Sequence, residues 1–311
     1  MTRGEEHKIR LALVGANGML AGAVRSLAPE NYDLVLLDLP DFDLTDKDRV
    51  LSVMNQVRPD VIVNCAAYTN VDGCETNEET ALLVNGSGPG YLAEAAKKLD
   101  ATLVHVSTDY VFDGTKNSPY TEEDVTNPQS AYGRSKLLGE KTILESGLEK
   151  FFIVRTSWLY GPGGKNFVET IARLAKEREE LRIVDDQVGS PTFTDDLARA
   201  IFNLLALDTP HASRLTPHGL YHFADEGECS WYEFAETIVA HLLEAETPLK
   251  MKRILPIATH EYPLPATRPA YSVFSKDKYR KVTGAKIPDW KTSLVTYLRS
   301  FRTQIKADAR R

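Results

Sequence analysis

The sequence contains little cysteine and no excess of basic residues. Its 311 residues include three cysteines, Cys65, Cys74 and Cys229. Their number is odd and their spacing is not that of metal ligands, which argues against a disulfide framework or a zinc site. This cysteine usage is typical of the reducing cytoplasm, where we expect the protein to be located. The formal net charge of −7 gives no electrostatic reason to bind nucleic acid or an anionic membrane.

Long hydrophobic runs and targeting segments are also missing. Residues 1–10 are charged and the apolar run after them is short, which predicts neither a signal peptide nor a membrane span. What the sequence does have is an ordinary globular composition, with 42% hydrophobic and 26% charged residues. Its length predicts one large domain or a major and a minor lobe.

The first expected strand and helix are joined by a glycine-rich turn. Residues 8–14 predict a strand, Gly15, Asn17 and Gly18 form the turn, and a helical pattern follows at residues 19–27. Glycine lets a backbone approach a pyrophosphate closely, and the first helical amides supply its counter-charge. The stretch therefore predicts a dinucleotide site, although a Gly-x-x-Gly pattern alone also fits a plain tight turn.

Segments after the next two strands fit the same site. Asp38 lies 23 residues after Gly15, where an acidic residue is expected to bond the adenosine ribose and repel a 2′-phosphate. We therefore expect NADH, with NADPH as an alternative. Asp43 and Leu44 could face the adenine, or Thr45 could simply be a helix N-cap. The small residues at 65–69 would let the chain pass close to a dinucleotide or form a packing corner.

Residues with catalytic chemistry come next. Thr108 lies at the expected carboxyl end of a strand, so its hydroxyl can polarise a substrate carbonyl or else cap a turn. Tyr132 and Lys136 are four residues apart and share one face of a helix. Because a nearby cation favours the phenolate, the pair is a predicted proton donor. The loop at residues 111–128 is rich in Gly, Asn, Pro and acidic residues, and we expect a solvent-facing flap.

The alternation of strands and helices defines the expected fold. It predicts an α/β protein with a doubly wound parallel Rossmann sheet in residues 1–160, to which a helix within residues 193–216 returns. Residues 161–311 are expected to form mainly a smaller mixed α/β substrate lobe at the C-terminal side.

The second half offers candidates for binding an anionic, aromatic ligand. The guanidinium of Arg268 suits phosphate oxygens, and Trp158 could face a sugar or base. A surface arginine and a core tryptophan are the alternatives. Gln187 and Thr192 are weaker candidates for sugar hydroxyls. The histidines, His105 and His222 among them, lack mutual spacing and are expected to be structural or exposed.

Taken together, the glycine turn and the Tyr-x-x-x-Lys pair resemble the extended short-chain dehydrogenase/reductase family. The chain is similar, more narrowly, to its dTDP-4-dehydrorhamnose reductase branch. The narrower resemblance rests on five stretches, of which the last three are much more specific than the two general motifs: residues 58–69, 107–114, 155–161, 186–192 and 262–269.

The resemblance implies an enzyme that reduces the C4 ketone of dTDP-4-dehydro-L-rhamnose to dTDP-L-rhamnose with NAD(P)H. It assigns the acid to Tyr132, nicotinamide ribose binding to Lys136 and the sugar carbonyl to Thr108. It also implies substrate contacts at Asp109 and Trp158 and cofactor contacts at Gly18, Met19, Leu20, Asp43, Leu44, Ala66, Ala67 and Tyr68. Some family members bind magnesium at a dimer contact, so a homodimer and magnesium are allowed, but no metal ligand can be assigned.

Two other classes of function remain open. One is another nucleotide-sugar enzyme of the family, such as an epimerase or a dehydratase. The other is a non-catalytic regulatory subunit, because the beta subunit of methionine adenosyltransferase resembles these reductases and keeps their fold.

Overall fold

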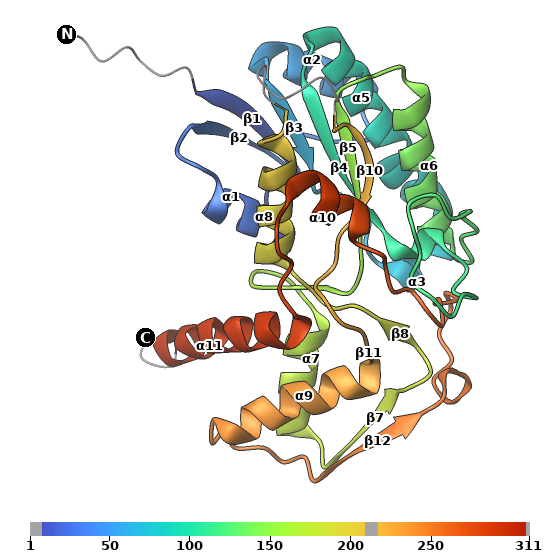
Figure 1. Cartoon of the computed structure of the whole chain (residues 1–311), viewed down its shortest axis with the longest axis vertical. Helices are drawn as coiled ribbons and strands as arrows, with labels where there is room; N and C mark the ends of the chain where they lie inside the picture. Colours follow the sequence, from blue (N-terminus) through green and yellow to red (C-terminus); the bar gives the residue numbers. More distant parts are fainter. Residues whose placement is uncertain (1–7, 209–216, 309–311) are drawn as a thin grey trace, which may run out of the picture.

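The larger lobe is built on a six-stranded parallel sheet (Figure 1). The computed structural model describes residues 8–208 and 217–308, so residues 209–216 of the expected returning segment lie outside the described residues. The expected α/β, doubly wound fold is confirmed. The strands, in their order across the sheet, are β2 (Tyr32–Leu37), β1 (Ile9–Val14), β3 (Val61–Asn64), β4 (Thr102–Thr108), β5 (Phe151–Thr156) and β10 (Gly219–His222).

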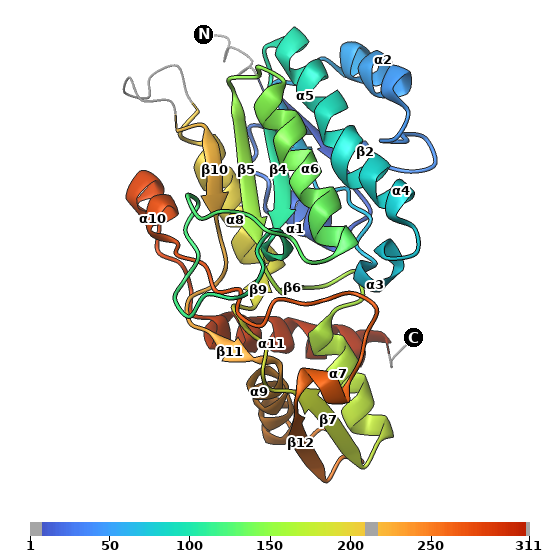
Figure 2. The same cartoon turned by 90° about the vertical axis from the view of Figure 1, so that its right-hand side faces the viewer.

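Helices cover both faces of this sheet (Figures 1 and 2). Side chains alternate along a strand, so Leu11 and Leu13 of β1 pack with one helix layer and Ala12 and Val14 with the other. The first layer contains α1 (Met19–Leu27) and α8 (Thr194–Leu205), and the second contains α2 (Lys47–Val57), α5 (Gly88–Leu99) and α6 (Ala131–Glu145).

Short helical segments follow two of the strands, β3 and β4, in the larger lobe. Between β3 and α5 the chain forms α3 (Val71–Cys74), α4 (Glu78–Ala81) and a π-helical segment, η1 (Leu82–Ser87), and β4 is followed by the short η2 (Asp109–Val111). The helix α2 begins after Asp46, which accepts a hydrogen bond from the amide of Arg49 at 3.0 Å. The expectation that Thr45 is the N-cap is therefore wrong, since Thr45 instead donates to Asp43.

The smaller lobe lies below the sheet in Figure 1 and has its own core around Ile171, Phe234, Ile238 and Leu294. Its helix α9 (Trp231–Glu244) begins with the expected capping box between Ser230 and Glu233, which is confirmed. The remaining elements are β6 (Leu159–Tyr160), α7 (Phe167–Glu177), β7 (Glu180–Val184), β8 (Val188–Gly189), β9 (Thr192–Phe193), β11 (Cys229–Ser230), β12 (Arg253–Ile257), η3 (Thr259–Glu261), α10 (Asp277–Thr283) and α11 (Trp290–Asp308).

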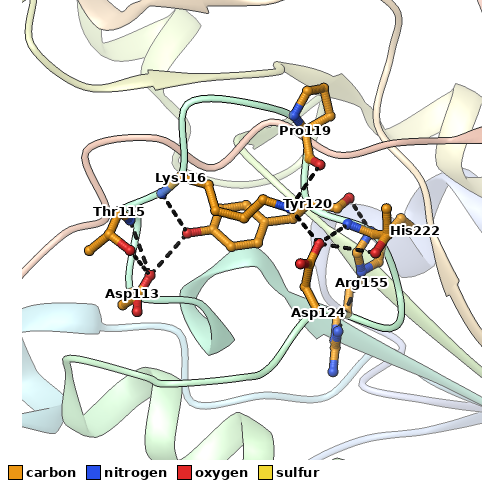
Figure 3. Close-up of polar contacts among 9 residues, drawn as sticks. Asp113, Thr115, Lys116, Pro119, Tyr120, Asp124, Arg155 and His222 are labelled. Carbon is orange, nitrogen blue, oxygen red and sulfur yellow. Dashed lines mark hydrogen bonds and ion pairs between the residues drawn. The ribbon is translucent and has the colours of Figure 1, made fainter.

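The loop at residues 111–128 faces solvent over much of its length, as its composition suggests, but buried aromatic residues fix it to the protein. Tyr120 is 2% exposed and stacks on Phe112 with ring centroids 4.1 Å apart. Figure 3 shows the polar contacts that hold Tyr120. Its hydroxyl donates to Asp113 at 3.0 Å, and its backbone carbonyl oxygen lies 3.1 Å from Nδ1 of His222. Lys116 closes the loop with an ion pair to Asp124. Two buried aromatic residues thus anchor a segment that otherwise reads as polar.

Candidate active site

The expected functional residues lie at the carboxyl edge of the sheet. Gly15 follows β1, Asp38 follows β2, Ala66 follows β3, and Thr108 ends β4. The sheet order reverses between β1 and β3, because the chain passes from β2 back over β1, and such a reversal opens a crevice where ligands bind. The first turn of α6 brings Tyr132 to the same edge.

Tyr132 contacts the end of β4. Ser130 caps α6 by accepting a hydrogen bond from the amide of Gly133 at 3.1 Å, and this cap fixes the turn that carries the phenol. The ring of Tyr132 packs edge-on against Tyr110, with centroids 5.4 Å apart. Burial raises the pKa of Tyr132, while a hydrogen bond with Thr108 opposes this rise. The lowered phenol pKa that the sequence led us to expect is therefore not present in the free protein.

Lys136 is buried one turn farther along α6, and only 2% of it is exposed. Its ammonium nitrogen Nζ donates to the carbonyl oxygen of Val106 at 2.6 Å and lies 3.4 Å from Nε2 of His105. Burial lowers the pKa of Lys136 to about 8, although the negative charge of Glu140 opposes this change. The amine can thus gain or lose a proton close to neutral pH.

Asp109 lies beside Thr108 and is completely buried. The hydroxyl of Thr108 donates to its Oδ1 at 2.9 Å. Burial raises the pKa of Asp109 to about 6, and hydrogen bonds with Ser272 and Thr108 oppose this shift. The contact with Asp109 therefore fixes the orientation of the Thr108 side chain. Burial of the ionised carboxyl group costs some folding stability.

On the cofactor side, the turn after β1 touches the segment after β3. Gly15 has a φ of +76°, and a Cβ there would lie 2.6 Å from the amide nitrogen of Ala66, so only glycine fits. The amide of Asn17 donates to Asp38 Oδ2 at 2.7 Å. Three loops from neighbouring strands are thereby joined around the first turn of α1, whose amides no side chain caps. This close backbone approach is what a dinucleotide pyrophosphate requires.

The other candidates for cofactor contact differ in what they present. Leu20 and Leu44 are buried. Leu44 packs so closely on Gly88 that a Cβ at residue 88 would lie only 2.5 Å from Cγ of Leu44. Their side chains belong to the core, so they would contact a cofactor through their backbone. Asp43 accepts two hydrogen bonds from Thr45, which lower its pKa. The sulfur of Met19 lies 3.8 Å from the amide of Asn166 in the smaller lobe.

Sequence reasoning missed Asn85, which fixes the segment containing Ala67 and Tyr68. Its Oδ1 accepts from the amide of Tyr68 at 2.7 Å, and its Nδ2 donates to the carbonyl of Tyr68 at 3.1 Å and to Ser135 at 3.0 Å. Asn85 lies in η1, and such π-helical insertions often occur at functional sites. The asparagine ties the loop after β3 to the helix that carries Tyr132.

Sequence reasoning also missed a buried polar cluster behind Thr108 and Lys136. Glu140 accepts hydrogen bonds from Ser107 and, through both oxygens, from Arg155 at 2.9 and 2.7 Å. Glu140 follows Lys136 by four residues, so helical spacing could have placed it on the same face. His105 also belongs here. It is buried and contacts Lys136, a contact that the sequence did not predict.

A cavity of about 590 Å³ lies in the smaller lobe. Gln187 and Arg268 line it, and so does Trp231. Trp158 has a φ of +47° and stacks on Trp231, with centroids 3.5 Å apart and planes inclined by 8°. Thr192 is completely buried against Thr156 and is not part of the cavity wall. The structure thus brings Trp158, Gln187 and Arg268 to one region and leaves Thr192 out.

Arg268 joins this cavity to α3. Its guanidinium donates to both carboxylate oxygens of Asp72, at 3.1 and 2.8 Å, and this pairing lowers the pKa of Asp72. Asp72 lies in α3, whose Cys74 shares an apolar cluster with Tyr132. The guanidinium of Arg268, which we expected to bind phosphate, is therefore paired with the carboxylate of Asp72 in the free protein.

Metal and membrane features are absent from the part of the chain that the structure describes. Residues 8–208 and 217–308 contain no group of three or more His, Cys, Asp or Glu that could hold a metal ion. The magnesium that the resemblance allows thus has no assigned ligands among them. Within the same ranges, no helix has the length and apolar character needed to span a membrane.

Comparison with known proteins decides the family. The model of the family described as the RmlD substrate binding domain matches residues 9–303. The chain belongs to this family. The RmlD-family relatives include a dTDP-4-dehydrorhamnose reductase of Burkholderia thailandensis, 41% identical over 95% of this chain and 100% of that protein. A dTDP-4-keto-6-deoxy-D-glucose reductase of Streptomyces niveus is 40% identical over 92% and 95%.

Solved structures of the RmlD family agree with this fold. A dTDP-4-dehydrorhamnose reductase of Bacillus anthracis in complex with NADP superimposes with a TM-score of 0.86. The two chains are 38% identical, and the match covers 94% of this chain and 99% of the other.

Proposed function

We propose that this RmlD-family protein is an NAD(P)H-dependent reductase that converts dTDP-4-dehydro-L-rhamnose to dTDP-L-rhamnose. The observation that carries the proposal is the position of Tyr132 beside Thr108, at the sheet edge that also holds the Gly15 turn and Asp38. The Burkholderia and Bacillus relatives, which are named as reductases of this type, support it.

The residues around the glycine turn fit a nicotinamide dinucleotide. Gly15 leaves a cradle that a Cβ would fill, and the first amides of α1 are available to a pyrophosphate. Asp38 would accept from the adenosine ribose, while Ala66, Ala67 and Tyr68 would line the path toward the nicotinamide. The bound dinucleotide supplies a hydride to the substrate. The carboxylate of Asp38 favours NADH, whereas the Bacillus relative binds NADP, so both cofactors belong in the test.

In the proposed mechanism, Tyr132 donates its phenolic proton to the oxygen that develops negative charge at C4. In the free protein the hydroxyl of Thr108 donates its one proton to Asp109 at 2.9 Å. When the substrate binds, this hydroxyl would turn its proton to the same C4 oxygen. Lys136 holds the nicotinamide ribose, and its positive charge assists the phenol. Because the pKa of Tyr132 is raised in the free protein, the phenol keeps its proton until a basic oxygen forms beside it.

The cavity in the smaller lobe is proposed to bind the dTDP portion. Its volume of about 590 Å³ falls within the range of small-molecule sites. Arg268 would exchange Asp72 for the diphosphate, since its planar fork fits either anion. Gln187 already donates to Thr259 at 3.0 Å within the cavity wall and is the candidate for a ligand hydroxyl. Trp158, fixed against Trp231, offers an aromatic face.

The decisive experiment is a spectrophotometric NADH oxidation assay with dTDP-4-dehydro-L-rhamnose generated in situ, run in parallel with NADPH. We expect cofactor consumption that depends on the sugar and yields dTDP-L-rhamnose. A protein that retains bound NAD and consumes no NADH would instead be an epimerase. Capture of a synthetase partner without reductase activity would favour the regulatory subunit.

A second candidate substrate is the 4-keto-6-deoxy-D-glucose nucleotide, because the Streptomyces relative is named for it and is 40% identical. Turnover of this sugar, measured without the epimerase that forms the rhamnose precursor, distinguishes the two. A homodimer also remains a prediction, which light scattering of the purified protein would test.

A further inference from the structure

His105 lies between Lys136 and a second strand. The ring is in β4 and is 1% exposed. Its Nδ1 lies 3.1 Å from Nδ2 of Asn64 in β3, and its Nε2 lies 3.4 Å from Nζ of Lys136 in α6. The three side chains form a continuous polar row, and the proposed mechanism gives no role to His105 and Asn64.

The orientation of Asn64 determines which ring nitrogen of His105 carries the proton. The amide of Ala66 donates to Oδ1 of Asn64 at 3.1 Å, so Nδ2 is the end that faces the imidazole. Nδ2 is a donor, which makes Nδ1 of His105 the acceptor. Burial and the charge of Lys136 lower the pKa of His105, so the ring is neutral and has one proton. That proton must therefore lie on Nε2.

The Nε2 proton faces Lys136. The nitrogen Nζ already donates to Val106 at 2.6 Å. A neutral amine has a lone pair that accepts from Nε2, whereas an ammonium group has none. The ring thus opposes the protonated form of Lys136, as burial does. The charge that acts in the other direction is that of Glu140 on α6. The Cys65 side chain after β3 also faces the amine, but burial raises the pKa of this thiol to about 12 and keeps it neutral.

The row cannot carry protons to solvent, because it ends at the backbone amide of Ala66. Its effect must be to fix a tautomer. We propose that Asn64 locks His105 in the Nε2–H form and that His105 is a positioning residue that acts through Lys136, controlling how readily this amine takes up the proton it needs to hold the nicotinamide ribose. The functional part of this inference rests on the proposed role of Lys136, but the tautomer does not.

The tautomer can be read in the free protein. Long-range proton–nitrogen NMR of labelled protein separates the two neutral forms and the imidazolium, and His105→Gln assigns the signal. We expect Nε2–H from about pH 6 to about pH 9 without titration. An Nδ1–H pattern, or an imidazolium signal in this range, would overturn the proposal without any reference to catalysis.

A double-mutant cycle tests the link to Lys136. Asn64→Asp keeps an acceptor for Ala66 but turns a second oxygen toward Nδ1, which moves the ring proton there and frees Nε2 to accept from the ammonium. The pH at which NAD(P)H affinity is half lost should then rise by about one unit, a tenfold change in proton affinity. Binding is measured by nucleotide fluorescence.

The charge of the new carboxylate also attracts the ammonium, so the same substitution is made in a His105→Phe background. We expect a clearly larger shift when His105 is present, and equal shifts would overturn the proposal. If affinity shows no dependence on pH in any variant, the ribose role of Lys136 fails with it. The NMR result still decides the tautomer if His105→Phe does not fold.

Discussion

Arg268 and Asp72 are 196 positions apart in the sequence and meet in a two-bond ion pair between the cavity and α3. The amide of Ala266 adds a third bond to the same carboxylate at 3.1 Å. Asp72 thus holds both the side chain of Arg268 and the backbone beside it. The pair connects the loop that borders the cavity to α3, so a ligand that takes Arg268 must loosen this connection.

Arg268→Met should weaken dTDP binding by about ten- to a hundredfold, because charge-assisted bonds contribute about 1.5–3 kcal/mol. NADH affinity should not change. Calorimetric titration with dTDP measures the effect. Arg173→Met is the matched control, since Arg173 forms only an exposed pair with Glu177 on α7. Undiminished dTDP affinity in Arg268→Met would remove this residue from the substrate site.

Tyr132→Phe should lower kcat by about 10²- to 10⁴-fold, the usual contribution of a general acid. NAD(P)H binding should stay within a few-fold of the wild type, because the ring and its contact with Tyr110 are retained. Steady-state kinetics and nucleotide fluorescence separate these two effects. Tyr91→Phe on α5 controls for the loss of a hydroxyl elsewhere. A kcat close to that of the wild type would exclude Tyr132 as the proton donor.

Asp109→Asn should raise the free energy of unfolding above about pH 6 and weaken substrate binding. Folding raises the pKa of Asp109 from 3.8 to about 6, so the stability associated with the protonated carboxyl is full below about pH 4 and is lost as the pH rises through 6. The neutral variant should therefore gain up to about 3 kcal/mol at pH 8 and nothing at pH 4. Urea unfolding at both values measures this difference.

The substrate KM of Asp109→Asn should rise at the same time. Asp113→Asn is the control with the opposite sign, because hydrogen bonds from Thr115 lower the pKa of Asp113. A stability gain in Asp109→Asn that does not depend on pH would contradict this account.

Glu140→Gln should cost about 3–5 kcal/mol, the usual consequence of leaving one partner of a buried ion pair unpaired. Both Glu140 and Arg155 are almost completely buried. Denaturant unfolding of this variant is compared with Glu177→Gln, whose exposed pair should contribute less than about 1 kcal/mol. Equal, small losses in the two variants would show that the buried pair is not important for stability.

Asp38→Ser should shift cofactor preference toward NADPH by about tenfold or more. The change removes the negative charge that repels a 2′-phosphate and keeps an acceptor for the amide of Asn17. Dissociation constants for NADH and NADPH give the ratio directly. Asp33→Ser is the control, because Asp33 lies on β2, the strand that Asp38 follows, and pairs with Arg10 at the surface. An unchanged ratio would show that specificity is determined elsewhere.

The local patterns predicted the sheet, the glycine turn and the capping box, because each depends on residues close together in the sequence. The contacts that complete the site are long-range. Asn85 reaches Ser135 across 50 positions and Asp72 reaches Arg268 across 196, and no periodicity in one sequence reveals such pairs. The buried anchor of the loop at residues 111–128 was missed for a related reason. The composition of the loop is polar, but Tyr120 fills a space formed by Phe274 and Ala224, which come from the other end of the chain.

The strand β10 determines whether the two lobes can be separated by cutting the chain. Gly219–His222 pairs with β5 in parallel register, although the chain has already built α7 and β7 of the smaller lobe before it reaches this position. A fragment ending near residue 160 would expose the hydrogen-bonding edge of β5 and the apolar surface that α8 covers on α1. Cutting between the lobes should therefore yield an aggregating half rather than a cofactor-binding module, and the two lobes should melt in a single transition.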